Sequence, residues 1–211
     1  MKRLLMVMLI ELVLGVGAEE TAERKTVLFL GDSLTAGYGL DEGRAFPALI
    51  QAKIDSLDWA FEVVNGGLSG ETSAGGLRRV NWLLRREIDV LVLELGGNDG
   101  LRGIPVAEMQ KNLQGIMDKA REKYSDIQIV LVGIEAPPNL GDDYTTAFRN
   151  VFPQLAKKND VFLIPFLLEG VGGNPELNLP DRIHPNVEGH QIVAETVWRT
   201  LKPVLENSQA K

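Results

Sequence analysis

The chain has 211 residues, of which 45% are hydrophobic and 24% charged, and its formal net charge is −7 at pH 7. This composition is typical of a globular protein, and the length suits one domain with a substantial core. The acidic balance argues against binding to the phosphate backbone of nucleic acids, and the lack of cysteine excludes disulfides and a thiol nucleophile.

The amino-terminal stretch differs from the rest of the chain. Two basic residues precede an apolar run over 4–16, and the small residues Gly17 and Ala18 then come before an acidic pair. This order of features predicts a secretory signal peptide over residues 1–18. The run is too short and too interrupted to predict stable insertion into a membrane.

A domain boundary and a location follow from this segment. We expect a single domain over residues 19–211 and a periplasmic or secreted protein. Glu11 interrupts the apolar run, so the alternative is a cytoplasmic protein with an apolar amino-terminal helix.

Five short apolar runs follow along the chain, at 26–30, 61–65, 90–95, 127–133 and 161–165. They begin roughly 30 to 37 residues apart, which is the spacing of βαβ units with crossover helices. Runs that are apolar on both faces suit a parallel sheet covered by helices on both sides.

The segments between these runs have the apolar periodicity of helices. The predicted helices cover 45–56, 73–86, 105–124, 143–158 and 187–205. The second carries four arginines, at 78, 79, 85 and 86, which we interpret as a solvated face in preference to an anion site.

Polar blocks follow several of the predicted strands. The first strand leads into Gly31-Asp32-Ser33, and later blocks lie at 65–70, 96–99 and 181–185. A serine at the carboxyl end of a strand lies at the edge where α/β sheets bind ligands. Gly-Asp-Ser is also ordinary turn chemistry, so the first block alone does not predict a site.

The chain has only two histidines, and a serine nucleophile needs a base. His190 falls within the last predicted helix, which favours a surface or packing role. His184 precedes that helix, and Asp181 lies three residues earlier, a spacing that lets a turn bring the carboxylate onto one ring nitrogen. The alternative for this pair is a cap cluster at the start of the helix.

The four blocks, in this order, resemble the GDSL/SGNH hydrolase superfamily, and the likeness covers about residues 26–205. The strings 31–37, 69–72 and 95–103 are similar to its bacterial periplasmic branch, which has thioesterase, lysophospholipase and arylesterase activities. The resemblance implies a three-layer α/β/α sandwich of flavodoxin-like type, with five parallel strands in the order 2-1-3-4-5.

The resemblance also implies catalytic roles. Ser33 is expected to attack the acyl carbon, His184 to relay the proton and Asp181 to orient His184. The expected oxyanion donors are the backbone N–H groups of Ser33 and Gly70 and the side-chain amide of Asn98, with Gly66 and Gly67 as competitors for Gly70.

The expected substrate is a small acyl ester or thioester. The loop over 100–105 has glycines at 100 and 103, and we expect it to move over the acyl group, with Leu101, Ile104 and Pro138 as apolar contacts. The alternative for this loop is an ordinary βα connection with turn residues. No cofactor is expected, and no metal-ligand spacing occurs. The alternatives are a carbohydrate O-acetylesterase of the same superfamily and a non-catalytic binding protein that keeps the fold.

Overall fold

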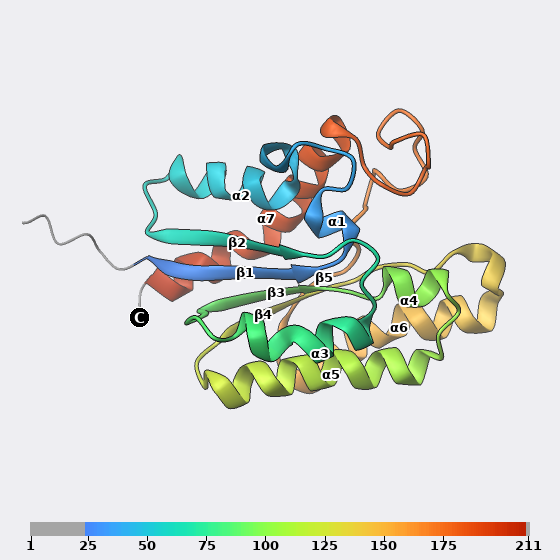
Figure 1. Cartoon of the computed structure of the whole chain (residues 1–211), viewed down its shortest axis with the longest axis horizontal. Coiled ribbons are helices and arrows are strands. Elements are labelled where there is room, and N and C mark those ends of the chain that lie inside the picture. The colour runs from blue at the N-terminus through green and yellow to red at the C-terminus, as the bar shows by residue number, and fades with distance from the viewer. Residues whose placement is uncertain (1–23, 210–211) are drawn as a thin grey trace, which may run out of the picture.

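A computed structural model describes residues 24–209 and has a parallel sheet of five strands in the order β2-β1-β3-β4-β5. The strands are β1 (Lys25–Gly31), β2 (Phe61–Gly67), β3 (Val90–Glu94), β4 (Gln128–Val132) and β5 (Phe162–Ile164). The predicted strand number, direction and order are confirmed (Figure 1).

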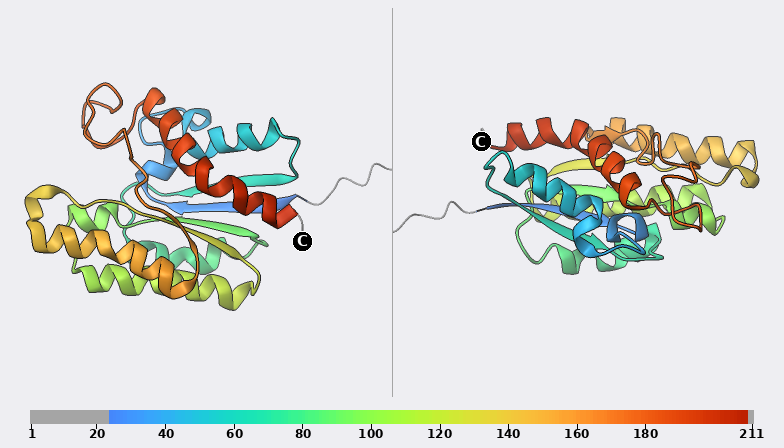
Figure 2. Two further views of the ribbon diagram at one scale, coloured as in Figure 1. Left: turned by 180° about the vertical axis from the view of Figure 1, so that it is seen from behind. Right: turned by 90° about the horizontal axis from the view of Figure 1, so that it is seen from above.

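Helices cover both faces of the sheet. Helices α2 (Phe46–Asp55) and α7 (Val187–Gln209) pack on one face, and α3 (Ser73–Leu83), α5 (Val106–Lys123) and α6 (Asp142–Asn159) lie on the other (Figures 1 and 2). Two one-turn helices, α1 (Ser33–Ala36) and α4 (Gly97–Leu101), follow β1 and β3, and 3₁₀ turns lie at η1 (Glu42–Arg44) and η2 (Pro138–Leu140). The three-layer α/β/α prediction is therefore confirmed.

Two helix ends differ from the sequence prediction. Helix α3 ends at Leu83, before the two arginines that the prediction included. Helix α7 continues through Pro203 to Gln209, because Val204 and Leu205 remain buried against the core and hold the last turns in place.

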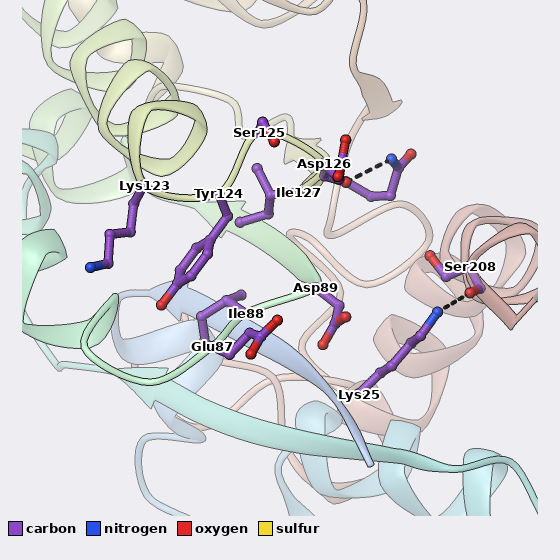
Figure 3. Close-up of a pocket in the computed structure, with 11 residues that line it drawn as sticks. Lys25, Glu87, Ile88, Asp89, Lys123, Tyr124, Ser125, Asp126, Ile127 and Ser208 are labelled. Carbon is purple, nitrogen blue, oxygen red and sulfur yellow. Dashed lines mark hydrogen bonds between the residues drawn. The ribbon is translucent and has the colours of Figure 1, made fainter. Parts of the chain in front are cut away.

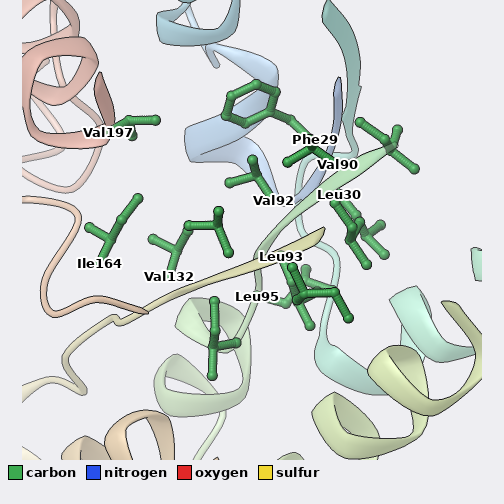
Figure 4. Close-up of a cluster of buried hydrophobic side chains, with 14 of the residues drawn as sticks. Phe29, Leu30, Val90, Val92, Leu93, Leu95, Val132, Ile164 and Val197 are labelled. Atoms are coloured by element: carbon green, nitrogen blue, oxygen red, sulfur yellow. The ribbon is translucent and has the colours of Figure 1, made fainter. Parts of the chain in front are cut away.

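Buried apolar side chains extend from both faces of the sheet (Figure 4). On one face the ring of Phe29 meets that of Phe46 edge to face, with centroids 5.5 Å apart. On the other face Leu95 lies so close to Gly76 of α3 that a Cβ at Gly76 would stand 2.4 Å from Leu95 Cδ1. Each such buried side chain contributes about 1.5–3 kcal/mol, so both faces stabilise the sheet.

The strand register makes three strand ends meet. Gly31 at the end of β1 pairs with Gly67 of β2 on one side and with Glu94 of β3 on the other. The chain leaves β1 for β2 on one side and returns to β3 on the other, which makes this edge the switch point of the sheet. The block that contains Ser33 starts at this point.

The predicted signal peptide over 1–18 lies outside the described residues. Over the part of the chain that the structure describes, none of the helices combines the length and the apolarity needed to cross a membrane.

Gly67 of β2 packs against the backbone of α1. A Cβ on this residue would lie 2.3 Å from the backbone nitrogen of Ala36 in α1, and backbone cannot move aside cheaply. We expect Gly67→Ala to lower the free energy of unfolding by about 1–3 kcal/mol in urea titrations. Gly43→Ala is the matched control, since nothing lies within 4 Å of its Cβ position. Equal stabilities of the two variants would contradict this packing of α1 on β2.

Candidate active site

Ser33 is the first residue of α1 and is held by both ends of that short helix. Asp32 caps the helix, its Oδ1 accepting a hydrogen bond from the N–H of Leu34 at 3.0 Å. Gly37 ends the helix with a φ of 74°, a left-handed conformation that glycine adopts without strain. The N–H of Tyr38 bonds to the Ser33 carbonyl at 3.0 Å. The serine therefore sits on a turn with little freedom.

His184 connects Ser33 to Asp181. Its Nε2 lies 2.8 Å from Ser33 Oγ, and its Nδ1 lies 2.7 Å from Asp181 Oδ2. A carboxylate can only accept, so the hydrogen sits on Nδ1 and leaves Nε2 as the acceptor for the serine hydroxyl. The structure brings together the three residues of the predicted triad, from two loops far apart in the sequence.

Hydrogen bonds to the carboxylate of Asp181 hold the turn that carries Asp181 and His184. Asp181 Oδ1 accepts hydrogen bonds from the N–H groups of Ile183 at 2.9 Å and His184 at 3.0 Å. Partial burial alone would raise the pKa of Asp181, but the N–H of Ile183 and both the ring and the N–H of His184 lower it to about 2. Asp181 is therefore ionised at neutral pH. The ring of Tyr38 lies against the imidazole, with centroids 4.5 Å apart.

Asn98 approaches the same turn from α4. Its Nδ2 donates to Asp32 Oδ2 at 3.1 Å. Because the carboxylate accepts only, this bond fixes which end of the amide faces Asp32 and leaves the second N–H of Nδ2 free to donate elsewhere. Burial raises the pKa of Asp32 to about 6, against the hydrogen bonds from Leu34 and Asn98 and the attraction of His184, which lower it. Above that pH Asp32 is an ionised acceptor.

Gly70 lies in the loop between β2 and α3 and has a φ of 80°. A Cβ there would meet only Arg102 Nη2, at 3.9 Å, and Arg102 donates to the Gly70 carbonyl at 3.0 Å. Of the competing glycines, Gly66 and Gly67 belong to β2, and the N–H of Gly67 bonds to Asn65 Oδ1 at 2.9 Å. Among the described residues, no acceptor bonds to the N–H of Ser33 or of Gly70.

The role of Asp99 was not predicted from the sequence. Its carboxylate is fully buried and accepts from the N–H of Ser73 at 2.8 Å and from Ser73 Oγ at 2.5 Å. Asn112 donates to the same hydroxyl at 3.0 Å. Asp99 therefore ties α4, which carries Asn98, to the first residue of α3. Its position directly after Asn98 suits turn chemistry equally well, so the order of residues offered no reason to single it out.

The interpretation of the α3 arginines as a solvated face is wrong for Arg79. Arg79 is paired with the buried carboxylate of Glu71, and its Nη2 also donates to the carbonyls of Gly66 at 2.6 Å and Gly31 at 3.4 Å. Glu71 follows Gly70 in the chain. The ion pair therefore links the Gly70 loop to the ends of β1 and β2.

His190 is a packing residue, as one of the two interpretations held. It is 1% exposed, and its Nδ1 accepts from the N–H of Phe46 at 3.1 Å. Burial lowers the pKa of His190 to about 4, so this histidine is neutral at physiological pH and holds α7 against α2.

The segment after Asn98 is more ordered than the sequence predicted. Gly100 is part of helix α4 and is buried, and a Cβ on it would lie 3.3 Å from the ring of Phe148. Gly100 is thus a packing glycine and not a hinge. Gly103 has a φ of 60°, which favours glycine, and nothing lies within 4 Å of its Cβ position.

The three predicted acyl contacts lie on two neighbouring segments. Leu101 is 53% exposed at the end of α4, and Ile104 is partly buried, its carbonyl accepting from Tyr144 Oη at 2.7 Å. Pro138 is exposed in η2, close in sequence to Ala136, which packs beside Gly100. Over residues 24–209 there is no cluster of three or more metal-ligating side chains.

A separate pocket of about 590 Å³ lies at the opposite edge of the sheet, near the start of β1 and β4 (Figure 3). It is lined by charged side chains, among them Lys25, Asp89 and Lys123, and Lys25 Nζ donates to the carbonyl of Ser208. None of the residues around Ser33 lines it. The hollow therefore has no part in the chemistry of the serine.

Comparisons with known proteins agree with this geometry. The model of the GDSL-like lipase/acylhydrolase family matches residues 29–192. Esterase TesA of Pseudomonas aeruginosa is 43% identical over 187 residues, which cover 88% of this chain and 92% of that protein. Thioesterase 1/protease 1/lysophospholipase L1 of Escherichia coli K12 is 38% identical over 187 residues, 88% of this chain and 88% of that protein.

A solved structure shares the fold at a similar level of identity. The crystal structure of the psychrotrophic esterase EstA from Pseudoalteromonas sp. has a TM-score of 0.81 and 34% identity, and the match covers 86% of this chain and 99% of that one. The matched segment includes Ser33, Asn98 and His184. Matches of this extent show that the chain belongs to the GDSL-like lipase/acylhydrolase family and is an acyl hydrolase.

Proposed function

We propose that this hydrolase cleaves acyl esters and thioesters through an acyl-serine intermediate on Ser33, with His184 as the base and Asp181 as its orienting carboxylate. The observation that carries the proposal is the continuous hydrogen-bonded path from Asp181 through both imidazole nitrogens to Ser33 Oγ, with contacts of 2.7 and 2.8 Å. The same path argues against a non-catalytic binding protein, which has no use for a positioned base.

The steps follow from the donors and acceptors around Ser33. As Ser33 Oγ attacks the acyl carbon, its proton passes to His184 Nε2, and the imidazolium is stabilised by the ionised Asp181. The oxyanion that forms receives hydrogen bonds from the N–H groups of Ser33 and Gly70 and from Asn98 Nδ2. The imidazolium then protonates the leaving alcohol or thiol, and water activated by the same Nε2 releases the acid from the acyl-serine.

Apolar surface near the serine favours an acyl chain over an acetylated sugar. Tyr38, Leu68, Leu101 and Ile183 are each between 44% and 53% exposed. The ring of Tyr38 lies against that of His184, and the other three are close in the chain to Gly70, Asn98 and His184. Each buried CH₂ of an acyl chain gains about 0.8 kcal/mol on such surface. We therefore assign aryl esters, acyl thioesters and lysophospholipids as substrates, with Leu101, Ile104 and Pro138 as contacts to the acyl group.

We also infer export to the periplasm or the medium, with residues 1–18 removed and 19–211 forming the mature domain. The support is the order of a basic start, an apolar run and small residues at the amino terminus.

The nucleophile and the base act as one unit in this mechanism. Ser33→Ala and His184→Ala should each abolish measurable hydrolysis of an aryl acetate, and the double variant should be hardly slower than either single variant. Losses that multiply in the double variant would mean that the two side chains serve different steps. Circular dichroism of each variant checks that the fold is kept.

Asn98 is expected to act only in the transition state. Asn98→Ala should lower kcat on the order of 10²–10³-fold and leave KM nearly unchanged, because one donor to the oxyanion is lost. Asn81→Ala, on the exposed face of α3, is the matched control and should behave as wild type. A large rise in KM at constant kcat would instead make Asn98 a ground-state binding residue.

Export makes a prediction about the amino terminus. Protein isolated from its host should begin at about Glu19, as read by amino-terminal sequencing of the active fraction. An active enzyme that begins at Met1 or Lys2 would overturn the export proposal and leave the assignment of the active site untouched.

A further inference from the structure

Glu94 is a buried acid that the proposed mechanism does not use. It ends β3 opposite Gly31 and has 0% exposure. The missing side chain of Gly31 makes room for it, since a Cβ at Gly31 would lie 2.6 Å from Glu94 Oε2. The carboxyl group therefore lies directly beneath the turn that carries Ser33.

The partners of Glu94 all belong to that turn. Its Oε2 bonds to Thr35 Oγ1 at 2.7 Å and accepts a longer hydrogen bond from the N–H of Asp32 at 3.3 Å. Thr35 is fully buried, and its carbonyl accepts from Asn65 Nδ2 at 3.0 Å. Glu94 Oε1 has no partner among the described residues. Glu94 thus reaches both sides of Ser33 along the turn and leaves one oxygen unpaired.

No positive group among residues 24–209 compensates a charge on Glu94. Asp32 of the turn lies next to Glu94, with its N–H bonded to Glu94 Oε2, and the negative charge of Asp32 repels a charge on Glu94. His184 attracts the charge of Asp32, and Asp99 repels it. Arg79 of α3 reaches the Gly31 carbonyl at 3.4 Å, but its guanidinium is paired with Glu71. An unpaired carboxylate removed from water is so costly that such a group takes up a proton instead.

We propose that Glu94 carries a proton at the pH at which the enzyme works, and that this neutral carboxyl group is a positioning residue for the turn that bears Ser33. The support is the 0% exposure of Glu94 and its unpaired Oε1. The 2.7 Å contact with Thr35 Oγ1 suits an O–H···O bond in which either oxygen donates.

The electrostatic balance agrees with this protonation state. Burial, and then repulsion by Asp32, raise the pKa of Glu94 well above its usual value, against the hydrogen bonds from Thr35 and Asp32, which lower it.

The proton on Glu94 has a consequence for Asp32. If both acids were ionised, each charge would raise the pKa of the other, so one of the pair takes up a proton, and Glu94 is the more buried of the two. A neutral Glu94 keeps the single negative charge on Asp32, which accepts from Asn98 Nδ2. The positioning role rests on the proposed function of Ser33 and Asn98, whereas the protonation state does not.

The protonation state can be tested by stability alone. A group whose pKa is raised on folding contributes stability that is present below its unfolded pKa and is lost as the pH rises towards its folded pKa. Glu94→Gln cannot titrate, so the unfolding constant of the wild type, divided by that of the variant, should rise between pH 5 and 8 by up to about tenfold per pH unit. Urea titrations at each pH in a Ser33→Ala background measure it without turnover.

A ratio that does not rise across this pH range would overturn the proposal. A carboxylate with a normal pKa gives a constant ratio, and so does one stabilised by the fold, because its contribution is fully present above the unfolded pKa. Any imperfect pairing of the amide in Glu94→Gln adds the same offset at every pH, so only the change of the ratio with pH is decisive.

The positioning role is tested by Thr35→Val, which keeps the shape of Thr35 and removes its bond to Glu94. We expect kcat to fall on the order of 10-fold with KM nearly constant, because the serine is misplaced whereas the binding of substrate is unaffected. Thr26→Val, a buried threonine at the far end of β1, is the matched control. Equal rates for the two variants would overturn the role.

Conservative rescue supplies a second measurement for the positioning role. Glu94→Ala should lower kcat, and Glu94→Gln should restore it to within a few-fold of wild type with the same pH profile of kcat/KM. A glutamine variant as slow as the alanine variant would show that a charge is needed. If Glu94→Ala does not fold, Glu94→Gln and Thr35→Val still decide the question.

Discussion

One hydrogen bond of 2.8 Å, between Ser33 Oγ and His184 Nε2, joins residues that are 151 positions apart in the chain. Its geometry depends on most of the fold. Ser33 is placed by the end of β1 and the one-turn helix α1, and His184 by the tight turn that starts at Asp181 just before α7. The packing of α7 on α2, held in part by the bond from Phe46 to His190, fixes the distance between these two ends.

A second constraint is the number of acids buried beneath the site. Asp32, Glu94 and Asp99 are each at most 1% exposed and lie within a few residues of Ser33 or Asn98. Each has a separate set of hydrogen-bond partners, namely Leu34 and Asn98 for Asp32, Thr35 for Glu94 and Ser73 for Asp99. Buried hydrogen bonds of this kind hold the turn and α4 rigidly, and rigidity is what an oxyanion site requires.

Much of the fold and the central residues of the site could be predicted from the sequence. Apolar runs at βαβ spacing indicate the sheet. Ser33 and Asn98 each follow such a run, and His184 lies in the loop before the last helix. The partners of the buried charges could not be predicted, because strand register decides that Glu94 lies beside Gly31, and the placement of α3 decides that Arg79 lies beside the end of β1. The one cue was a lone charge in the apolar run that forms β3. Gly100 was misjudged because a glycine required for packing looks the same in sequence as a hinge.

The central claim is that Ser33 is the nucleophile activated by His184, and covalent labelling tests it most directly. A fluorophosphonate should add to one serine per molecule, and mass spectrometry of the digested protein should place the adduct on Ser33. Labelling should disappear in Ser33→Ala and be strongly slowed in His184→Ala, because an unactivated serine hydroxyl is a poor nucleophile. An adduct on a different serine that appears in step with the loss of activity would contradict the account.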